Sequence, residues 1–294
     1  MKIVTYNIQF GLGKDELFDL ERIASAVDGA DIIVLQEVER NWQRSSMVDQ
    51  PEVLAELLYQ YYWVYGPFFD VDASKHEANG KVTNVRRQFG NMILSKTPII
   101  STRLFPLPKS IINDQRNMVV GMLEGVVDLP GGEALRIYNT HLSAKSAEDR
   151  IAQIHTIRKI ITKAPDQGGA WTGPSTHPLW LEDNITPPMP EKFVLLGDFN
   201  LAPLDLEYDH LVRASRNECD LVDCWSLTGH EINKGVTFPS NKINSQRIDF
   251  AFVSATMQNL VLDAWIDETA QGSDHQPYWI KLESDTFTRF VDLL

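Results

Sequence analysis

The sequence predicts an α/β protein in which mixed β-sheets are flanked by helices. Two features of the pattern support this fold class. Apolar, β-branched stretches of strand length occur along the chain together with stretches whose apolar residues recur at helical spacing. Several neighbouring strand stretches have no helix between them, whereas a purely parallel, doubly wound sheet needs a helix in each crossover.

The first part of the chain begins with a predicted strand at 2–10, where apolar and polar residues alternate. A helix is predicted over 14–30, because its apolar residues recur at helical spacing and a glycine lies near its expected end. An apolar run predicts a strand at 31–38, and 51–62 predicts a helix that starts with Pro51. The apolar residues of the first helix are Leu17, Leu20, Ile23, Ala24 and Val27.

The longest predicted helix covers 147–164 and carries isoleucines on one face. No linker or repeat of fixed period divides the chain, so we expect one domain over 1–294. A Pro-, Gly- and Trp-rich stretch at 165–190 is interpreted as a surface excursion, of the kind that is often functional or disordered. The remaining strands are predicted at 91–100, 118–129, 134–142, 192–200, 246–254 and 273–282.

Composition narrows the classes of function. The 294 residues are 43% hydrophobic and 23% charged, as in an ordinary globular protein with a sizeable core. The formal net charge is −13, whereas a domain that holds nucleic acid mainly through phosphates usually has a basic patch. A broad nucleic-acid-binding surface is therefore not expected. Lys81, Arg86 and Arg87 form the densest basic stretch, which either contacts phosphates or is a solvated loop.

Cysteine usage and hydropathy bear on the cellular setting. Cys219 and Cys224 are the two cysteines, so a zinc site is poorly supported and both are expected to be reduced and partly buried. No apolar run approaches the roughly 20 residues that span a bilayer. The opening "MKIVTYNI" is too short for the apolar region of a signal peptide. We expect a cytoplasmic monomer.

Polar residues of metal-binding or proton-transferring types occur where the predicted strands end or begin. The clearest case is "FVLLGDFN", which places Asp198 and Asn200 directly after a buried strand. A charged group beside a buried strand costs free energy unless it is paired or coordinated, so repeated placements of this kind suggest one shared site. The others are Asn7, Glu37, Asn139, His141, Asp249, Asp274 and His275.

Each placement also has an ordinary explanation. Asn7 could cap its own backbone, and Glu37 could form a salt bridge with Arg40. His141 could be a buried histidine with satisfied hydrogen bonds, and "GDFN" and "SDH" could be turn or cap sequences. The joint occurrence of all these residues in one order is what indicates a functional site.

That order resembles the endonuclease/exonuclease/phosphatase family, the superfamily of DNase I, AP endonucleases, neutral sphingomyelinases and inositol-polyphosphate 5-phosphatases. The matching stretches cover Met1 to roughly Pro277. The resemblance implies a four-layer α/β sandwich of two mixed sheets, with the site where both sheets open. The stretches are "TYNIQFG", "DIIVLQEV", "FGNMILSK", "YNTHLS", "LLGDFN", "RIDFAFVS" and "GSDHQP".

The resemblance also implies roles for single residues. Glu37 resembles the principal metal carboxylate, with Asn7 as its partner and Asp274 as a metal-side carboxylate. Asp198 and Asn200 resemble the pair that orients the attacking water and contacts the phosphate.

Two histidines complete the implied catalytic set. His275 and His141 resemble the phosphate-facing histidines, and Asp249 resembles the carboxylate that fixes the His275 tautomer. Asn91 and Arg116 fall where the family often has polar residues that line the site.

Further residues are candidates for contact with the substrate. Asn139 is placed with the site-lining residues, and Trp171 and Trp180 could form a substrate wall, because rings in a Pro/Gly-rich loop are hard to bury. Some family members carry Asp where this chain has Gln9. A neutral side chain there weakens a second cation site, so one bound metal is expected.

The chemistry of these residues predicts a divalent-metal-dependent phosphoesterase. Carboxylate and amide oxygens suit Mg²⁺, with Mn²⁺ as a possible substitute. Asp249 would favour a protonated His275, and Asp198 is the natural base for a water. No Ser or Cys lies in a nucleophile setting, which favours direct attack by water.

The substrate class stays open from the sequence. The acidic composition favours a small or non-duplex phosphodiester or phosphomonoester. The alternatives are a Mg²⁺-dependent nuclease acting on DNA and a non-catalytic scaffold with the same fold, although a scaffold would be expected to have a damaged site.

Overall fold

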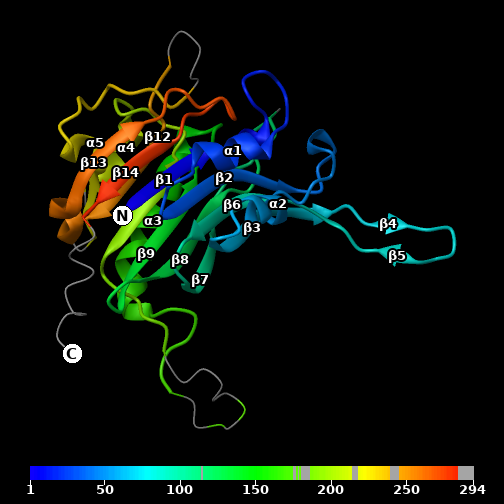
Figure 1. The fold of residues 1–294 in the computed structure, drawn as a ribbon, viewed down its shortest axis with the longest axis horizontal. Coiled ribbons are helices and arrows are strands. Elements are labelled where there is room, and N and C mark those ends of the chain that lie inside the picture. The colour runs from blue at the N-terminus through cyan, green and yellow to red at the C-terminus, as the bar shows by residue number, and fades with distance from the viewer. Residues whose placement is uncertain are drawn as a thin grey trace.

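Two six-stranded β-sheets lie face to face and carry the rest of the structure (Figure 1). This computed structural model describes residues 1–113, 115–174, 177, 179, 186–213, 218–238 and 245–283. In order across the first sheet lie β13 (Val261–Ile266), β14 (Tyr278–Leu282), β1 (Lys2–Asn7), β2 (Ile32–Arg40), β6 (Arg86–Ser95) and β3 (Tyr62–Asp72). In order across the second lie β11 (Leu221–Asp223), β12 (Asp249–Ser254), β10 (Phe193–Asp198), β9 (Glu133–His141), β8 (Gly121–Leu129) and β7 (Ile99–Pro106).

Both sheets are mixed. Each has one parallel pair at its centre, β1 with β2 and β9 with β10, and antiparallel neighbours elsewhere. Side chains alternate between the faces of a strand, so one apolar set from each sheet meets in the space between them. The carboxyl ends of the four parallel strands point to the same end of the molecule, and this is where the polar residues lie.

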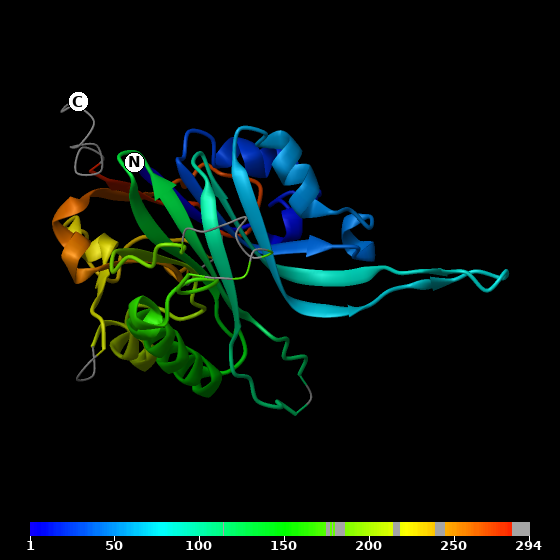
Figure 2. The same cartoon turned by 90° about the horizontal axis from the view of Figure 1, so that it is seen from below.

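Helices cover the outer face of each sheet, which gives four layers (Figure 2). On the first sheet these are α1 (Leu20–Ala26) and α2 (Gln50–Leu57), and on the second α3 (Ala147–Gln167) and α4 (Leu206–Val212). The predicted fold class, a four-layer α/β sandwich, is confirmed. Short helical segments complete the structure: η1 (Gln9–Gly11), η2 (Gln43–Ser45), α5 (Cys224–Leu227) and η4 (Ala255–Leu260).

No helix within the described ranges is both long and apolar enough to cross a membrane.

Several element boundaries differ from the sequence predictions. The helix expected from residue 14 begins at Leu20, because Asp19 caps it by accepting from the N–H groups of Glu21 and Arg22. Leu17, assigned to its apolar face, is 63% exposed. The stretch 91–100 is not one strand, since β6 ends at Ser95 and β7 begins at Ile99.

Beyond the first sheet, β3 and β6 continue as a two-stranded arm (Figures 1 and 2). The short strands β4 (Lys75–His76) and β5 (Val82–Thr83) lie near its tip. Lys81 pairs with Glu77 at 3.7 Å and is well exposed. The basic stretch at Lys81 is therefore part of a solvated arm rather than an irregular loop.

The 165–190 stretch begins inside α3, because that helix continues through Pro165. Pro165 has no N–H, so the carbonyl of Ile161 loses its helical donor. Arg136 Nη1 donates to that carbonyl at 3.0 Å and to the Tyr138 hydroxyl at 2.8 Å. The buried arginine therefore compensates for a proline in a neighbouring helix.

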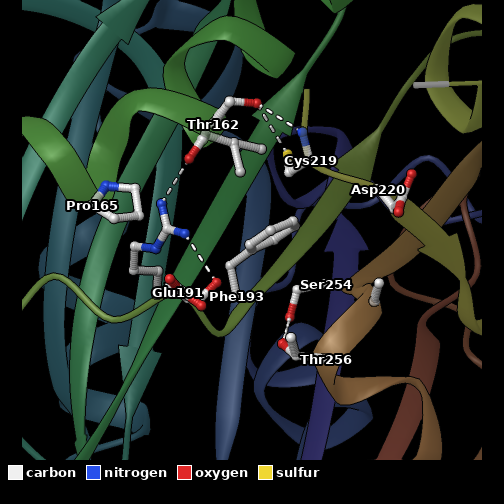
Figure 3. Close-up of a pocket in the computed structure, with 11 residues that line it drawn as sticks. Thr162, Pro165, Glu191, Phe193, Cys219, Asp220, Ser254 and Thr256 are labelled. Carbon is white, nitrogen blue, oxygen red and sulfur yellow. Dashed lines mark hydrogen bonds between the residues drawn. The ribbon is translucent and has the colours of Figure 1, made fainter. Parts of the chain in front are cut away.

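A cavity of about 270 Å³ lies beside Pro165 (Figure 3). It is at the opposite end of β9 and β10 from the polar residues, since Phe193 pairs with Arg136 and Asp198 pairs with His141. Cys219 lines it, and burial raises the pKa of this thiol, as it does that of Cys224. Both thiols are free.

Replacing Arg136 with Met should leave the Ile161 carbonyl without a donor and lower the free energy of unfolding by about 1–3 kcal/mol. In a Pro165→Ala background, the alanine N–H can take over, so the same replacement should cost about 1 kcal/mol less. Urea denaturation of the four proteins measures both losses. Equal losses in the two backgrounds would contradict this account of Arg136.

Candidate active site

Three adjacent strands of the second sheet place a row of polar residues at one end. Asp198 on β10 lies opposite His141 on β9 and opposite Asp249 on β12. Residues directly opposite on neighbouring strands share a face, so the three side chains project together. His141 Nε2 lies 3.5 Å from Asp198 Oδ2.

The first sheet closes this row through Asn7, at the end of β1. Its Nδ2 donates to Asp198 Oδ2 at 2.9 Å and lies 3.3 Å from Glu37 Oε1. One amide therefore joins a carboxylate from each sheet. Asn7, Glu37 and Asp198 therefore lie together, as their positions at strand ends predicted.

Glu37 reaches the site because β2 is irregular at this point. The register with β6 shifts between Leu35 and Val38, and Glu37 itself has φ of 60°. A non-glycine residue in the left-handed region is uncommon, and bulges of this kind re-aim a side chain. The bulge turns the Glu37 carboxylate toward the end of the sheet.

Asn139 bridges the two sheets beneath the site. Its Nδ2 donates to the carbonyls of Leu35 and Met92 at 2.9 Å each, at the point where the β2–β6 pairing is interrupted. Its Oδ1 accepts from Gln36 Nε2 at 2.7 Å. The side chain is fully buried and its hydrogen bonds are used, so the prediction that Asn139 contacts the substrate does not fit the structure.

Asn91 makes a second bridge between the sheets. Its Nδ2 donates to the Asn139 carbonyl at 3.0 Å and approaches the Gly121 carbonyl at 3.4 Å. Its Oδ1 accepts no hydrogen bond from the described residues. Asn91 is therefore anchored at one end, and a role in substrate contact stays a prediction.

His275 is held between two carboxylates. Its Nδ1 lies 2.8 Å from Asp249 Oδ2, and its Nε2 lies 3.7 Å from Asp198 Oδ2. Burial alone would lower the pKa of His275, but Asp249 and Asp198 outweigh it and raise the pKa to about 10. The Phe238 ring packs against the imidazole at 4.6 Å. His275 is thus a fixed, protonated donor.

For Asp198, the effect of burial on the pKa outweighs that of the neighbouring charges. Burial raises its pKa to about 7, although His275 opposes that shift. Its Oδ1 accepts from the Asn200 N–H at 2.9 Å, and the Asn200 amide is held by the Leu142 carbonyl at 3.0 Å. A carboxylate with a pKa close to neutral is suited to accept a proton.

The pKa values of Glu37 and His141 are also shifted. Burial raises the pKa of Glu37, against the effect of the nearby His141 and His275 rings. Burial lowers the pKa of His141, against the Glu37 carboxylate. His141 is therefore a neutral imidazole, in contrast to His275.

A metal ion fits the donor set at this end of the sheets. Asp198, Asp249 and His275 offer ligand atoms within 4.8 Å of one another. However, the His275 imidazole is already held by Asp249 at 2.8 Å, so we favour a position nearer Glu37. The Asn7 amide is the one hydrogen-bond donor to the Glu37 carboxylate among the described residues, and a desolvated carboxylate of this kind suits a hard cation.

Asp249 supplies a further sign of a missing positive group. Its Oδ1 is buried and has no hydrogen-bond partner within the described ranges. Asp274 is half-buried, and its N–H approaches Gln9 Oε1 at 3.4 Å. The neutral Gln9 therefore lies beside Asp274, and the expectation of one cation rather than two stays a prediction.

The other residues that the sequence predicts to contact substrate form no hydrogen bond or ion pair with the site residues in the described part of the chain. Arg116 is exposed on the segment that joins β7 to β8, and β8 begins beside the end of β9. Trp171 is 41% exposed beyond the end of α3. Trp180 lies outside the described residues. The roles of Arg116 and the tryptophans stay predictions.

Several residues that position the site were not singled out from the sequence. Ser273 donates to the Asn7 carbonyl at 2.8 Å and accepts from the His275 N–H at 3.1 Å. Gly197 has φ of 147°, and a Cβ there would lie 1.8 Å from the Thr140 carbonyl oxygen. A glycine inside a strand stretch, as in "LLGDF", is the signal that could have indicated such a close approach.

The chain matches a known protein family over most of its length. The profile described as "Endonuclease/Exonuclease/phosphatase family" matches residues 4–275. The chain belongs to this family, whose members are hydrolases that act on phosphoesters. No curated protein sequence matches it significantly.

Solved structures show the same fold. The endonuclease/exonuclease/phosphatase from Bacteroides vulgatus has a TM-score of 0.67 and 18% identity, over 96% of this chain and 98% of that one. The mannosyl-6-phosphatase from Bacteroides thetaiotaomicron has a TM-score of 0.62 and 18% identity, over 96% and 99%. The 3′-5′ exonuclease from Neisseria meningitidis has a TM-score of 0.56 and 18% identity, over 96% and 100%.

The Asn139→Leu variant tests the bridge. It removes the donor to two buried carbonyls and the acceptor for Gln36, so the free energy of unfolding should fall by about 3 kcal/mol or more. The adjacent Thr140→Val variant loses one long hydrogen bond, from the Thr140 hydroxyl to the Gly121 carbonyl at 3.4 Å. Its free energy of unfolding should fall by much less. Urea denaturation compares them. A fully stable Asn139→Leu protein would favour substrate contact after all.

Proposed function

We propose that this protein hydrolyses a phosphate ester by direct attack of a water that Asp198 activates. The observation that carries the proposal is the row of His141, Asp198 and Asp249, joined to Glu37 by Asn7 and to His275 by a 2.8 Å contact. A base, two imidazoles and an oxygen-rich metal position thus meet at one end of both sheets.

Asp198 acts as the base in this proposal. Its pKa of about 7 lets it take a proton from water near neutral pH, and Asn7 and Asn200 fix its two oxygens. The Asn200 side chain, anchored on the Leu142 carbonyl, is placed to hold the water or a phosphate oxygen.

The two histidines have different charges and therefore different tasks. His275, protonated and fixed by Asp249, donates to a phosphate oxygen and stabilises the negative charge that develops there. His141 is neutral and contributes one hydrogen bond without adding charge. Preoriented donors of this kind need no reorganisation during the reaction.

Glu37, with Asn7 beside it, would hold a divalent cation, for which Mg²⁺ is the best match and Mn²⁺ a substitute. Asp274 is the second carboxylate that we assign to the metal. When bound, the cation neutralises charge on the phosphate and so favours attack by a nucleophile. Gln9 beside Asp274 favours one cation over two.

Water is the proposed nucleophile because the serine hydroxyl beside His275 is occupied. The Ser273 hydroxyl is buried and donates to the Asn7 carbonyl. Activation of a serine would need an adjacent base within hydrogen-bond reach, and its bonds are structural instead.

A small or non-duplex substrate fits the charge of the surface. The chain carries a net charge of −13, and most described arginines are paired with carboxylates, so a continuous basic track for a duplex is not evident. The mannosyl-6-phosphatase is one precedent for this fold. A nuclease is the alternative, favoured by the likeness to the 3′-5′ exonuclease.

Asp198→Asn should abolish hydrolysis while leaving the melting temperature nearly unchanged, because asparagine keeps the shape of the side chain but cannot accept the proton. Release of phosphate and cleavage products is measured on sugar phosphates, inositol phosphates, single-stranded DNA, abasic duplex, supercoiled plasmid and sphingomyelin, each with Mg²⁺. Retained turnover in the variant would contradict the mechanism. Rapid nicking of plasmid at physiological salt would contradict the proposal that the substrate is small or non-duplex.

Glu37→Gln should weaken Mg²⁺ binding by about tenfold or more, since it replaces the charged oxygen ligand with a neutral amide. Isothermal titration calorimetry with MgCl₂ measures the change directly, without substrate. Exposed Glu52→Gln on α2 is the matched control and should bind Mg²⁺ like the unmodified protein. The same affinity in Glu37→Gln and the control would place the metal elsewhere.

A further inference from the structure

An arginine and aromatic cluster lies beyond Glu37 at the end of the first sheet. We call it the Trp42 cluster, and the proposed function does not use it. It gathers residues from η1, from the segment after β2 and from the base of the arm. Its members are Phe10, Trp42, Arg44, Arg87 and Phe89.

The Trp42 cluster faces the active-site side of the sheet. Phe89 lies two residues from Asn91 on β6, so the two side chains share a face. Asn91 donates across to Asn139 in the second sheet, which identifies that face as the inner one. Glu39, opposite Phe89, lies two residues beyond Glu37 in the same strand.

Arg44 is held rigidly in this cluster. Its Nε and Nη2 donate to one oxygen of the fully buried Glu39 at 3.0 and 2.6 Å. Its guanidinium carbon lies 3.8 Å from the Phe10 ring centroid and 4.4 Å from that of Trp42. Nη1 donates to none of the described residues, so an oriented guanidinium edge is left available. A group fixed in advance loses little conformational entropy when a ligand binds.

Arg87 brings a second guanidinium to the same indole. Its carbon lies 5.7 Å from the Trp42 centroid, and its Nε donates to the Asn41 carbonyl at 3.3 Å. Within the described ranges every arginine forms an ion pair with a carboxylate except Arg87, Arg116 and Arg136. On so acidic a chain, a half-buried arginine without a carboxylate partner, beside another arginine, is suited to an anion.

The backbone that carries these side chains is strained. Phe10 has φ of 47°, in a region that bulky residues rarely occupy, whereas Asn41, with φ of 60°, is of a type that tolerates this region. Strain of this kind persists where the surroundings hold it, and it concentrates at ligand-binding sites. Gln9, Ser46 and Met47 in the same segments also have positive φ.

We infer that Arg44 and Arg87, arranged around Trp42, bind a second anionic group of the substrate, separate from the phosphate that is hydrolysed. This inference rests on the proposed function. A phosphate fits best, because guanidinium groups bind its oxygens in pairs. The second phosphate belongs either to the neighbouring nucleotide of a single strand or to a small molecule with two phosphates.

The test measures binding rather than turnover. In the Asp198→Asn protein with Mg²⁺, calorimetry compares two matched pairs of ligands. One pair is glucose 6-phosphate and glucose 1,6-bisphosphate, and the other is a 3′-phosphorylated nucleoside and the 3′-phosphorylated dinucleotide. In at least one pair, the ligand with the second phosphate should bind about tenfold more tightly. The pair that shows the preference identifies the source of the phosphate.

Arg87→Gln should reduce that preference to about threefold or less, because it removes a cation that no carboxylate neutralises. Arg86→Gln is the control, since neighbouring residues on a strand point to opposite faces and Arg86 is paired with Asp70 at 2.8 Å. It should keep the full preference. Arg87 is the decisive position, because Arg44→Gln would also leave Glu39 buried without its partner.

An unchanged preference in Arg87→Gln, or no preference in either pair, would overturn the inference. Failure of the proposed function is recognised separately. If the unmodified protein hydrolyses no phosphoester but the Arg87-dependent preference is present, the Trp42 cluster binds a second phosphate and the catalytic proposal is wrong.

Discussion

The buried amide of Asn139 holds the two sheets together where the ladder between β2 and β6 is interrupted. The irregularity in β2 aims Glu37 at the site, and it leaves the carbonyls of Leu35 and Met92 to be satisfied from elsewhere. Unpaired carbonyls in a dry interior are costly, so the bulge depends on a donor from the second sheet. The same amide accepts from Gln36, which fixes its orientation. The position of a residue on one sheet is thereby set by a side chain on the other.

Electrostatics at the site follow from this packing. Asp198 and Asp249 are buried, and Glu37 lies half-buried beside them. Burying several carboxylates together is unfavourable unless positive charge accompanies them. His275 supplies part of that charge, which is why its pKa rises although burial opposes the change. Among the described residues Asp249 Oδ1 has no hydrogen-bond partner, and burial raises the pKa of Glu37. Both observations favour additional positive charge at the site, which a bound cation would provide.

Much of the site could be predicted from strand ends, because apolar runs that finish in Asn, Asp or His mark where side chains leave the core. Asp198 and His141 lie opposite each other at the ends of β10 and β9, as this pattern led us to expect, and their catalytic roles stay predictions. Asn139 was misplaced, since its two-residue spacing from His141 looks like a continuation of the same polar row and nothing in the sequence announces a bulge on a different strand. The Trp42 cluster was also beyond sequence reasoning, because it joins segments that only the register of β2 with β6 brings together. The start of α1 depended on a cap, which periodicity does not detect.

The arm formed by β3 and β6 leaves the body of the first sheet and so has two open edges (Figure 2). A bare ladder of this kind invites another chain to add a strand. Here the exposed positions carry Asp70, Asp72, Lys75 and Arg86, which keep charge along both strands. Charged edges discourage pairing with a copy of the same chain. The arm therefore extends from the body of the first sheet as a two-stranded ribbon whose charged positions disfavour the addition of a further strand.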